Sequence, residues 1–516
     1  MKPQSPSVRR ASNQWLVFLT YHERVAAPLT GRVRWAKVPA MLDLIIRGGQ
    51  VVTPSGVGAW DVGVDGERIV AVAQPGSLPA SSARVLDATG KLVVPGGIDP
   101  HTHLAHPIMS HPDEPGITLG PEDDSRGMAF GGTTTYIDFC YVRPGTDIPT
   151  ALEQRAARWK ANSHVDYAFH ITLCGALDLR IFEQIPDAIA EGFPTFKVFT
   201  TNVLPPHPKR QTNRLDYGRI QFAMEKAAPR GGLIVVHGED EDLVQFNYER
   251  FRAEGRTDGT NMHLVHTNLS ELLAFRRTVA LARAMRAAVY FVHTSAREGV
   301  EAIREARGLG LPVYGETLHQ YACFNAEYYK TPRGFCSHTY PSLKFPEDQA
   351  ALWDGLVRDG LSTLATDEYP TSLALKLRGT RIDDVTGGNV GAEARMGIAY
   401  SEGVVKRGMS LDRFVDITSA NAARIFGLYP KKGAIAPGSD ADLVLIDPGL
   451  HKTLTRDDFH VTDYSPWEGW EVSGWPVTTL LRGKLIADHG KLLGTPLDGQ
   501  LVKRKIETAV LERPVC

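Results

Sequence analysis

The middle of the chain alternates short apolar runs with amphipathic stretches such as residues 270–286. Eight of these runs are predicted to be strands: residues 91–101, 133–139, 166–173, 195–199, 233–237, 289–293, 312–316 and 361–367. Strands that alternate with helices indicate parallel βαβ units. Eight such units fit an α/β fold of the (β/α)8 TIM-type barrel, whose active site lies at the C-terminal ends of the strands.

The two ends of the chain have a different pattern of apolar and glycine residues. Residues 41–91 are short strands separated by glycine turns, and similar strands return after residue 432. This pattern is typical of all-β structure and predicts one small flanking β-sandwich built from both chain ends. The expected organisation is an extension over 1–40, sandwich over 41–91, barrel over 92–431, sandwich over 432–494 and a tail over 495–516.

The extension contains the apolar run WLVFLT, which superficially resembles part of a signal peptide. The run is short and is followed at once by Tyr21, His22, Glu23 and Arg24, so we do not interpret it as an export signal. We expect residues 1–40 to be only loosely attached. No apolar run reaches the roughly 18 residues of a membrane span.

Composition narrows the class of protein. Lysine and arginine number 57 and aspartate and glutamate 59, which lacks the basic excess expected of proteins that bind nucleic acid or membrane surfaces. The five cysteines are scattered and form no CxxC pair. Reduced thiols in a cytoplasmic protein are the simplest interpretation.

Polar side chains recur at or near the C-terminal ends of the predicted barrel strands: His101, His103, Lys197, His237, His293 and Asp367. Each alone has an ordinary explanation; a histidine at a strand end is often structural, and Lys197 could extend its amine to water from an edge strand. Coincidence at five of eight strands is much less plausible. Other histidines of predicted loops and helices, including His266, are interpreted as surface or supporting residues.

Four histidines and an aspartate suit Zn²⁺ or a similar divalent ion. Six positions, with Lys197, exceed the needs of one tetrahedral zinc and fit two ions. Two ions about 3.5–4 Å apart can share a hydroxide and polarise a carbonyl. The constellation therefore indicates hydrolysis of an amide.

Several longer motifs support this interpretation: VVPGGIDPHTHL (93–104), FKVF (196–199), VVHGED (235–240), YFVHTS (290–295), NVGAEARM (389–396), FGLYPKKGAIAPGSDADLVLIDP (426–448) and EGWEVSGWPV (468–477). Through them, residues 41–494 resemble the hydantoinase/dihydropyrimidinase branch of the amidohydrolase superfamily. The resemblance implies a dinuclear metal centre, a homotetramer and hydrolysis of a small cyclic amide.

The resemblance also assigns roles to single residues. His101, His103 and Asp367 would bind the more buried ion, and His237 and His293 the other. Lys197, carboxylated by CO₂, would bridge the two; a carbamate anion is stabilised by two dications that would repel an ammonium. Asp367 would act as general base, taking a proton from the bridging hydroxide and delivering it to the leaving nitrogen.

The chain departs from the family pattern at its substrate contacts. Asn202 stands where relatives usually place a tyrosine that contacts the substrate carbonyl, and Tyr340 could supply a hydroxyl instead. Gly387 replaces a usual asparagine, with Asn389 close by. The residue after Asp367 is Glu368 rather than histidine. Asn202, Tyr340 and Asn389 are the predicted substrate contacts.

The resulting hypothesis is a metal-dependent hydrolase that opens a hydantoin, dihydropyrimidine or related cyclic imide. One alternative is an allantoinase- or dihydroorotase-like enzyme, although Leu104 stands where dihydroorotases usually have a carboxylate-binding arginine. A non-catalytic scaffold related to dihydropyrimidinase is a second possibility. A mononuclear deaminase is a third, but it leaves Lys197 unexplained.

Overall fold

The computed structural model describes residues 42–79, 83–388 and 390–516. The expected extension over residues 1–40 and the predicted substrate contact Asn389 lie outside the described residues.

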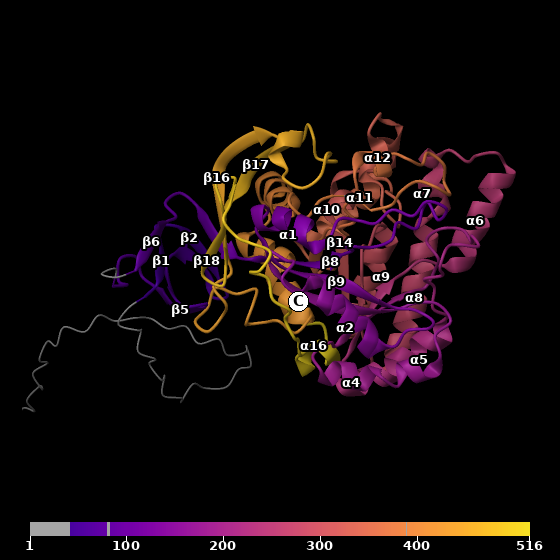
Figure 1. The fold of residues 1–516 in the computed structure, drawn as a ribbon, viewed down its shortest axis with the longest axis horizontal. Coiled ribbons are helices and arrows are strands. Elements are labelled where there is room, and N and C mark those ends of the chain that lie inside the picture. The colour runs from indigo at the N-terminus through magenta and orange to yellow at the C-terminus, as the bar shows by residue number, and fades with distance from the viewer. Residues whose placement is uncertain (1–41, 80–82, 389) are drawn as a thin grey trace, which may run out of the picture.

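Eight parallel strands of the described chain form the barrel (Figure 1). They follow one another in sequence order around the sheet: β8 (Gly97–Thr102), β9 (Thr133–Val142), β10 (Asp166–Leu173), β11 (Thr195–Phe199), β12 (Leu233–His237), β13 (Ala288–Phe291), β14 (Val313–Leu318) and β15 (Thr363–Ala365). The barrel closes beyond β15, where the backbone amide of His103 donates to the carbonyl of Glu368 at 2.7 Å. The predicted fold class is confirmed.

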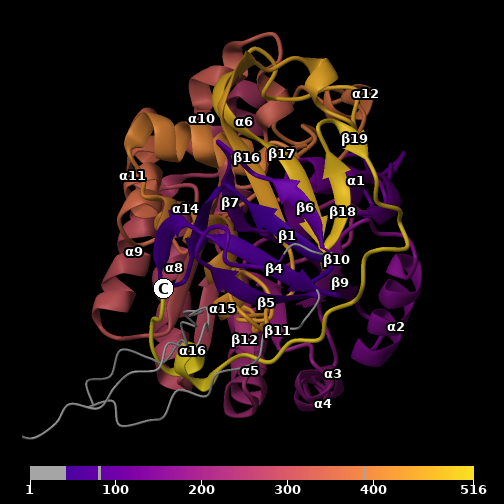
Figure 2. The ribbon, with the colours of Figure 1, turned by 90° about the vertical axis from the view of Figure 1, so that its left-hand side faces the viewer.

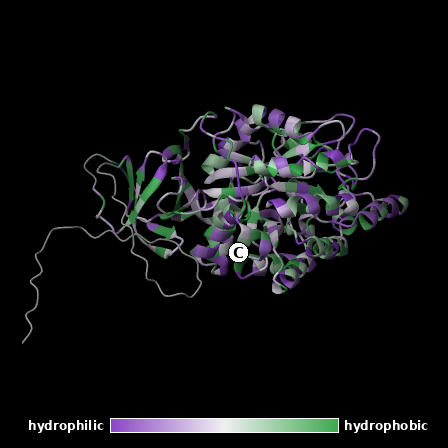
Figure 3. Cartoon of the chain, turned by 90° about the horizontal axis from the view of Figure 1, so that it is seen from below, coloured by the Kyte–Doolittle hydropathy of each residue, from purple (hydrophilic) through white to green (hydrophobic). Residues whose placement is uncertain are grey.

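Helices surround this barrel and continue beyond it: α1 (Pro121–Phe130), α2 (Ile148–Trp159), α3 (Leu179–Phe182), α4 (Ile185–Ala190), α5 (Tyr217–Ala227), α6 (Glu241–Ala253), α7 (Met262–Val265), α8 (Asn268–Met285), α9 (Arg297–Gly308), α10 (His319–Cys323), α11 (Pro346–Val357), α12 (Leu373–Lys376), α13 (Arg395–Ile398), α14 (Leu411–Val415), α15 (Asn421–Ile425) and α16 (Thr508–Glu512). Along the outer helices, hydrophilic and hydrophobic residues are interspersed (Figure 3).

Local sequence explains how strands and helices follow each other. The barrel strands are apolar runs buried along their whole length, as in the LIVVH run of β12, because both faces of a parallel sheet are covered. Polar caps then begin the helices. Asp240 accepts a hydrogen bond from the Leu243 amide at the start of α6, and Thr267 accepts one from the Ser270 amide at the start of α8.

Two further sheets of the described chain form the flanking sandwich (Figure 2). One has the order β5 (Arg68–Ala73), β4 (Asp61–Asp65), β1 (Leu44–Arg47) and β6 (Arg84–Asp87). The other has the order β19 (Lys491–Leu492), β18 (Lys484–Asp488), β17 (Glu471–Leu481), β16 (Leu443–Thr453), β7 (Leu92–Pro95), β2 (Gln50–Thr53) and β3 (Gly56–Ala59). Apolar residues from both chain ends, such as Val62 and Leu443, share one core.

The single strand predicted over residues 91–101 is wrong: it is two strands in two different sheets. β7 pairs antiparallel with β16 in the sandwich, whereas β8 pairs in parallel with β9 in the barrel. Gly96 separates them, and a Cβ atom there would lie only 2.1 Å from Oγ1 of Thr134. The chain therefore needs glycine to pass from one sheet to the other.

The C-terminal tail packs along the barrel. The amide of Tyr167 donates to the carbonyl of Gln500 at 3.0 Å, and the amide of Val502 donates back to the carbonyl of Tyr167 at 2.8 Å. Val502 and Ile506 join an apolar cluster with barrel residues such as Ile98 and Tyr290. The tail thus covers the end of the barrel opposite the predicted site.

Two further features of the described chain concern membrane-spanning helices and cysteines. None of the described helices combines the length and the apolar character needed to cross a bilayer. The five cysteines are all free.

Candidate metal centre

The fold brings all six predicted metal-site residues to the wall of one cavity of about 110 Å³. His101 lies near the end of β8, His237 ends β12, and Lys197 lies within β11. His103, His293 and Asp367 follow β8, β13 and β15 within two residues. The C-terminal ends of parallel strands meet at one mouth of a barrel, which explains why residues so far apart in sequence converge.

His101, His103 and Asp367 form the tightest group. Nε2 of His101 lies 3.2 Å from Nε2 of His103, and Oδ1 of Asp367 lies 3.0 Å from the first nitrogen and 3.1 Å from the second. Their ligand atoms all lie within 4.8 Å of one another. Three donor atoms aimed at one point are suited to holding a cation.

The backbone is strained at two of the six residues. His293 has φ 38° and Asp367 has φ 51°, in the left-handed region that non-glycine residues seldom occupy. Such strain is typical of functional sites, where surrounding structure holds a residue in a costly conformation. Here each residue follows the end of its strand and contributes its side chain to the cavity wall.

Glu316, at the C-terminal half of β14, was not predicted as a site residue. Its Oε1 lies 2.6 Å from Nδ1 of His101 and accepts a hydrogen bond from the amide of His293 at 3.0 Å. Burial opposes charge on His101, but Glu316 and Asp367 together raise the pKa of the imidazole to about 9. A carboxylate at Nδ1 orients the ring with Nε2 toward the cavity, as is usual for metal-binding histidines.

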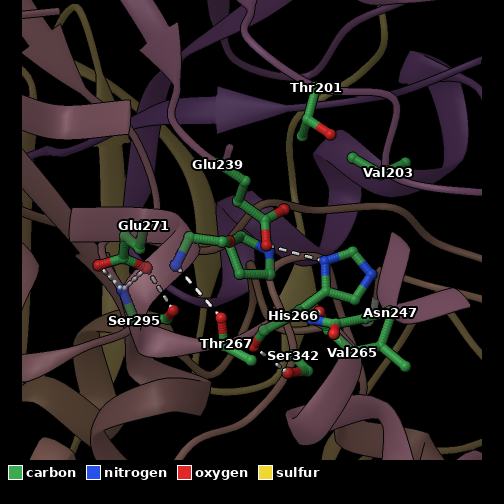
Figure 4. Close-up of polar contacts among 12 residues, drawn as sticks. Thr201, Val203, Glu239, Asn247, Val265, His266, Thr267, Glu271, Ser295 and Ser342 are labelled. Carbon is green, nitrogen blue, oxygen red and sulfur yellow. Dashed lines mark hydrogen bonds and ion pairs between the residues drawn. The ribbon is translucent and has the colours of Figure 1, made fainter. Parts of the chain in front are cut away.

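A second carboxylate, Glu239, supports His237 in the same way. Oε2 of Glu239 lies 2.9 Å from Nε2 of His237, which leaves Nδ1 as the ring nitrogen for a metal. Oε1 of Glu239 lies 2.8 Å from Nδ1 of His266 (Figure 4). Of the two roles expected for His266, surface or supporting, the structure therefore gives it the supporting one.

Sequence reasoning missed both glutamates, although a signal existed. Glu316 ends the seventh predicted strand, and Glu239 follows His237 by two residues. An acidic residue near the C-terminal end of a buried strand is as unusual as a histidine there.

Lys197 lies on a central strand of the barrel, between β10 and β12. Its side chain is 1% exposed, so the alternative in which the amine reaches water from an edge strand is wrong. Nζ has no hydrogen-bond partner among the described residues, and burial lowers the pKa of the amine to about 7. An unpartnered buried amine of this kind is costly as an ammonium.

These observations fit a metal centre. The histidines offer ring nitrogens, Asp367 is held ionised, and Lys197 is a buried amine with no hydrogen-bonding partner in the described chain. Burial opposes ionisation of Asp367, but His101 and then His103 keep its pKa well below the usual range. The donor set of imidazole and carboxylate suits a divalent cation.

The predicted substrate contacts are placed differently. Tyr340 lines the cavity, but its hydroxyl donates to the carbonyl of Val385 at 3.0 Å. Asn202 does not belong to the described cavity wall, where Asn213 is found instead. Its Oδ1 accepts from Thr212 Oγ1 at 2.8 Å and from the Asn213 amide at 3.0 Å. A substrate contact by Asn202 stays a prediction.

Gly387, one of the departures from the family pattern, lies against the predicted substrate contact Tyr340. A Cβ atom on Gly387 would lie 2.3 Å from Cδ2 of Tyr340, so the ring occupies the space that any larger side chain at 387 would need. Glu368, in contrast, is not part of the described cavity wall and accepts hydrogen bonds from the amides of Gly391 and Ala392, each at 2.7 Å.

A second group of acids, Asp166, Asp440 and Asp442, is also close enough to hold an ion. Cations already contact it: Nζ of Lys432 lies 2.8, 3.0 and 2.5 Å from the three carboxylates, respectively, Arg482 also pairs with Asp166, and Lys431 pairs with Asp440. We interpret this cluster as an ionic contact between sandwich and barrel and not as a metal site.

The barrel, the flanking sandwich and the histidine–aspartate mouth together define an amidohydrolase. Residues 92–486 match the sequence profile of the amidohydrolase family, and the chain belongs to that family. A D-hydantoinase of Geobacillus stearothermophilus is 34% identical over 470 residues, which span 89% of this chain and 96% of that protein.

Solved structures of hydantoinases and dihydropyrimidinases are also similar to this chain. The crystal structure of dihydropyrimidinase from Brevibacillus agri NCHU1002 superposes with a TM-score of 0.84 at 34% identity, covering 90% of this chain and 99% of that one. An L-hydantoinase (dihydropyrimidinase) from Arthrobacter aurescens gives a TM-score of 0.80 at 27% identity, covering 90% and 100%.

Proposed function

We propose that this protein is a metal-dependent cyclic amidohydrolase that opens a hydantoin, a dihydropyrimidine or a related cyclic imide. The observation that carries the proposal is the convergence of His101, His103, Lys197, His237, His293 and Asp367 on one cavity. The matched proteins named D-hydantoinase, dihydropyrimidinase and L-hydantoinase support the substrate class.

In this proposal His101, His103 and Asp367 would hold one divalent ion, and His237 and His293 would hold a second. Lys197, carboxylated on Nζ, would contribute its carbamate oxygens to both. When bound, two such ions lower the pKa of water and polarise a carbonyl. Zn²⁺ is the favoured ion because the ligands are mostly imidazoles.

The chain's own residues handle the proton. Oδ1 of Asp367 faces the two histidines, whereas Oδ2 accepts a hydrogen bond from Thr339 Oγ1 at 2.7 Å. Oδ2 takes a proton as water adds to the ring carbonyl carbon. It returns that proton to the ring nitrogen as the C–N bond breaks, which leaves an N-carbamoyl or amic acid.

Lys197 is prepared for modification by its surroundings. The pKa of its ammonium form is about 7. The amine is therefore largely neutral in mildly alkaline solution and can add to CO₂. The product is a carbamate anion and one released proton. This removes the cost of burying an unpaired ammonium.

A cytoplasmic location and a homotetrameric assembly are part of the same proposal. They rest on the family resemblance and on the free cysteines.

A substrate panel tests the proposal. Protein supplied with Zn²⁺ and bicarbonate is incubated with hydantoin, 5-substituted hydantoins, dihydrouracil, allantoin and dihydroorotate, and ring opening is followed by loss of ultraviolet absorbance or by chromatography. Turnover of hydantoins or dihydrouracil, abolished in Asp367→Ala, is the expected result. Preference for allantoin or dihydroorotate would favour the sister enzymes, and failure to bind metal or open any ring would favour a scaffold.

A further inference from the structure

Arg143 lies on the wall of the cavity that holds the metal-site residues. It follows β9 directly, and its guanidinium carbon lies 5.0 Å from the ring centroid of Tyr141. The hydroxyl of Tyr141 in turn lies 3.4 Å from Nδ1 of His103. The guanidinium is therefore only one tyrosine ring away from the metal centre.

The charge of Arg143 is not neutralised within the described chain. Its terminal nitrogens donate to Oδ1 of Asn213 at 3.1 Å and, at 3.4 Å, to the carbonyl of Thr212, both uncharged groups. Three other cations of the adjoining surface pocket are paired: Arg155 with Asp138, Arg158 with Glu122 and Lys209 with Asp113. A half-buried guanidinium has five N–H donors, so most of them are free to bind a ligand.

The rest of the cavity wall is mainly apolar. Ile108, Met109, Val203 and Leu204 contribute to it, together with the rings of Tyr340 and Tyr369. A ligand that fills this cavity therefore contacts three kinds of surface: the predicted metal ligands, hydrocarbon and a cation with no charge partner in the described chain.

We propose that Arg143 is a specificity-determining residue that binds a carboxylate on the substrate's substituent. The substrate class is then a cyclic amide whose apolar substituent ends in a carboxylate. This inference rests on the proposed function for the position of the reacting ring. Guanidinium and carboxylate match in shape and charge and can form two parallel hydrogen bonds.

A purely structural role for Arg143 would be to fasten the 212–213 loop through Asn213. That role requires only hydrogen-bond donors, and it predicts that mutation of Arg143 lowers kcat/KM equally for every substrate. Recognition of a carboxylate instead requires the positive charge of Arg143, and it predicts that kcat/KM falls only for acidic substrates.

The test compares two hydantoins of nearly equal shape, 5-(2-carboxyethyl)hydantoin and 5-(2-carbamoylethyl)hydantoin. Wild-type protein should favour the acid in kcat/KM, and Arg143→Gln should lower kcat/KM for the acid by about 10- to 100-fold while changing the amide far less. Arg143→Lys should retain part of the preference because it keeps the charge. Arg214→Gln is the matched control, since Arg214 is an exposed arginine of the facing loop that does not line the cavity.

Absence of an acid preference in the wild type, or equal losses for acid and amide in Arg143→Gln, would overturn the inference and leave the proposed function intact. If neither compound is hydrolysed, calorimetric Kd values of the acid for the metal-loaded wild type and Arg143→Gln decide the matter without turnover. Weaker binding to the variant supports the inference, and equal binding, or no binding to either, refutes it.

Discussion

Nδ1 of His101 and Oε1 of Glu316 lie 2.6 Å apart, on the side of the imidazole away from His103 and Asp367. Glu316 also accepts hydrogen bonds from the Tyr290 hydroxyl at 2.8 Å and from the His293 amide at 3.0 Å. One buried carboxylate therefore fixes a ring on β8 and the backbone after β13. It links two histidines assigned to different metal ions.

Glu316→Gln should weaken metal binding by about 10- to 100-fold, the usual effect of losing a carboxylate behind a metal-binding histidine. Glutamine keeps an acceptor for His101 but removes the charge that makes its ring a strong ligand. Competition with a chelator measures the change. Glu305→Gln, which disrupts an exposed pair with Arg276, is the control, and unchanged affinity in Glu316→Gln would contradict the assigned role.

Carboxylation of Lys197 should depend on pH. Burial lowers the pKa of this amine to about 7, and only the neutral amine adds to CO₂. The carbamate formed with ¹³C-labelled bicarbonate should therefore increase as pH rises from about 6 to about 8, as measured by ¹³C NMR. Lys197→Arg should give no signal at this position. Equal carbamate at both pH values would show that the amine is not titrating in this range.

Asn202→Ala should raise KM without lowering metal content. The side chain ties the end of β11 to residues 212–214 and donates from Nδ2 to Glu241 at 3.0 Å, and this region carries Asn213 and Leu204 to the cavity wall. Asn202→Asp, which keeps the acceptor oxygen but replaces the donor to Glu241 with a second oxygen, is the comparison. Steady-state kinetics with metal analysis provides the measurement, and a fully active alanine variant would exclude both tethering and substrate contact.

Asp124 should make the protein less stable as pH rises. Burial, and then the charges of Asp99 and Glu393, raise the pKa of this carboxyl to about 8. An acid with a raised pKa binds its proton more tightly in the folded state, so its stabilising contribution is complete below pH about 4 and is lost as pH rises through about 8. Urea unfolding should show that Asp124→Asn is more stable than wild type at pH about 8 by on the order of 2 kcal/mol. A stability difference that does not change between mildly acidic and mildly alkaline solution would contradict this.

Lys432→Met should destabilise the protein by about 3–5 kcal/mol, because Lys432 contacts all three buried carboxylates and is the only cation paired with Asp442 in the described chain. Urea unfolding measures the loss. Lys484→Met is the matched control: Lys484 pairs with Asp498 at 2.6 Å but is half exposed, and an exposed pair contributes about 0–1 kcal/mol. Similar losses in the two variants would mean that the buried cluster is not a specific contact.

The sequence was most informative where a single residue conflicted with its surroundings. Lys197 in an apolar strand and histidines at strand ends are costly unless they serve a site, so the pattern along the chain was enough to predict that they lie together, and they line one cavity. The barrel was equally accessible because its strands are buried on both faces and are therefore continuously apolar. The prediction of one strand over residues 91–101 was wrong for the same reason. Two buried strands in succession form one continuous apolar run, so the sequence pattern does not separate them.

Apolar periodicity and the polar residues that interrupt it thus determined the fold class and the choice of six candidate metal-site residues. Only the tertiary structure decided which side chains support them and which line the cavity beside them. Distances across the barrel show that Glu316 and Glu239 each pair with a histidine of the candidate site. The partners of Arg143 show that its charge is not paired within the described chain. Asn202 lies near Lys197 in sequence, yet its amide is engaged by a loop that folds back on it. Such contacts arise from long-range packing, which local sequence patterns do not encode.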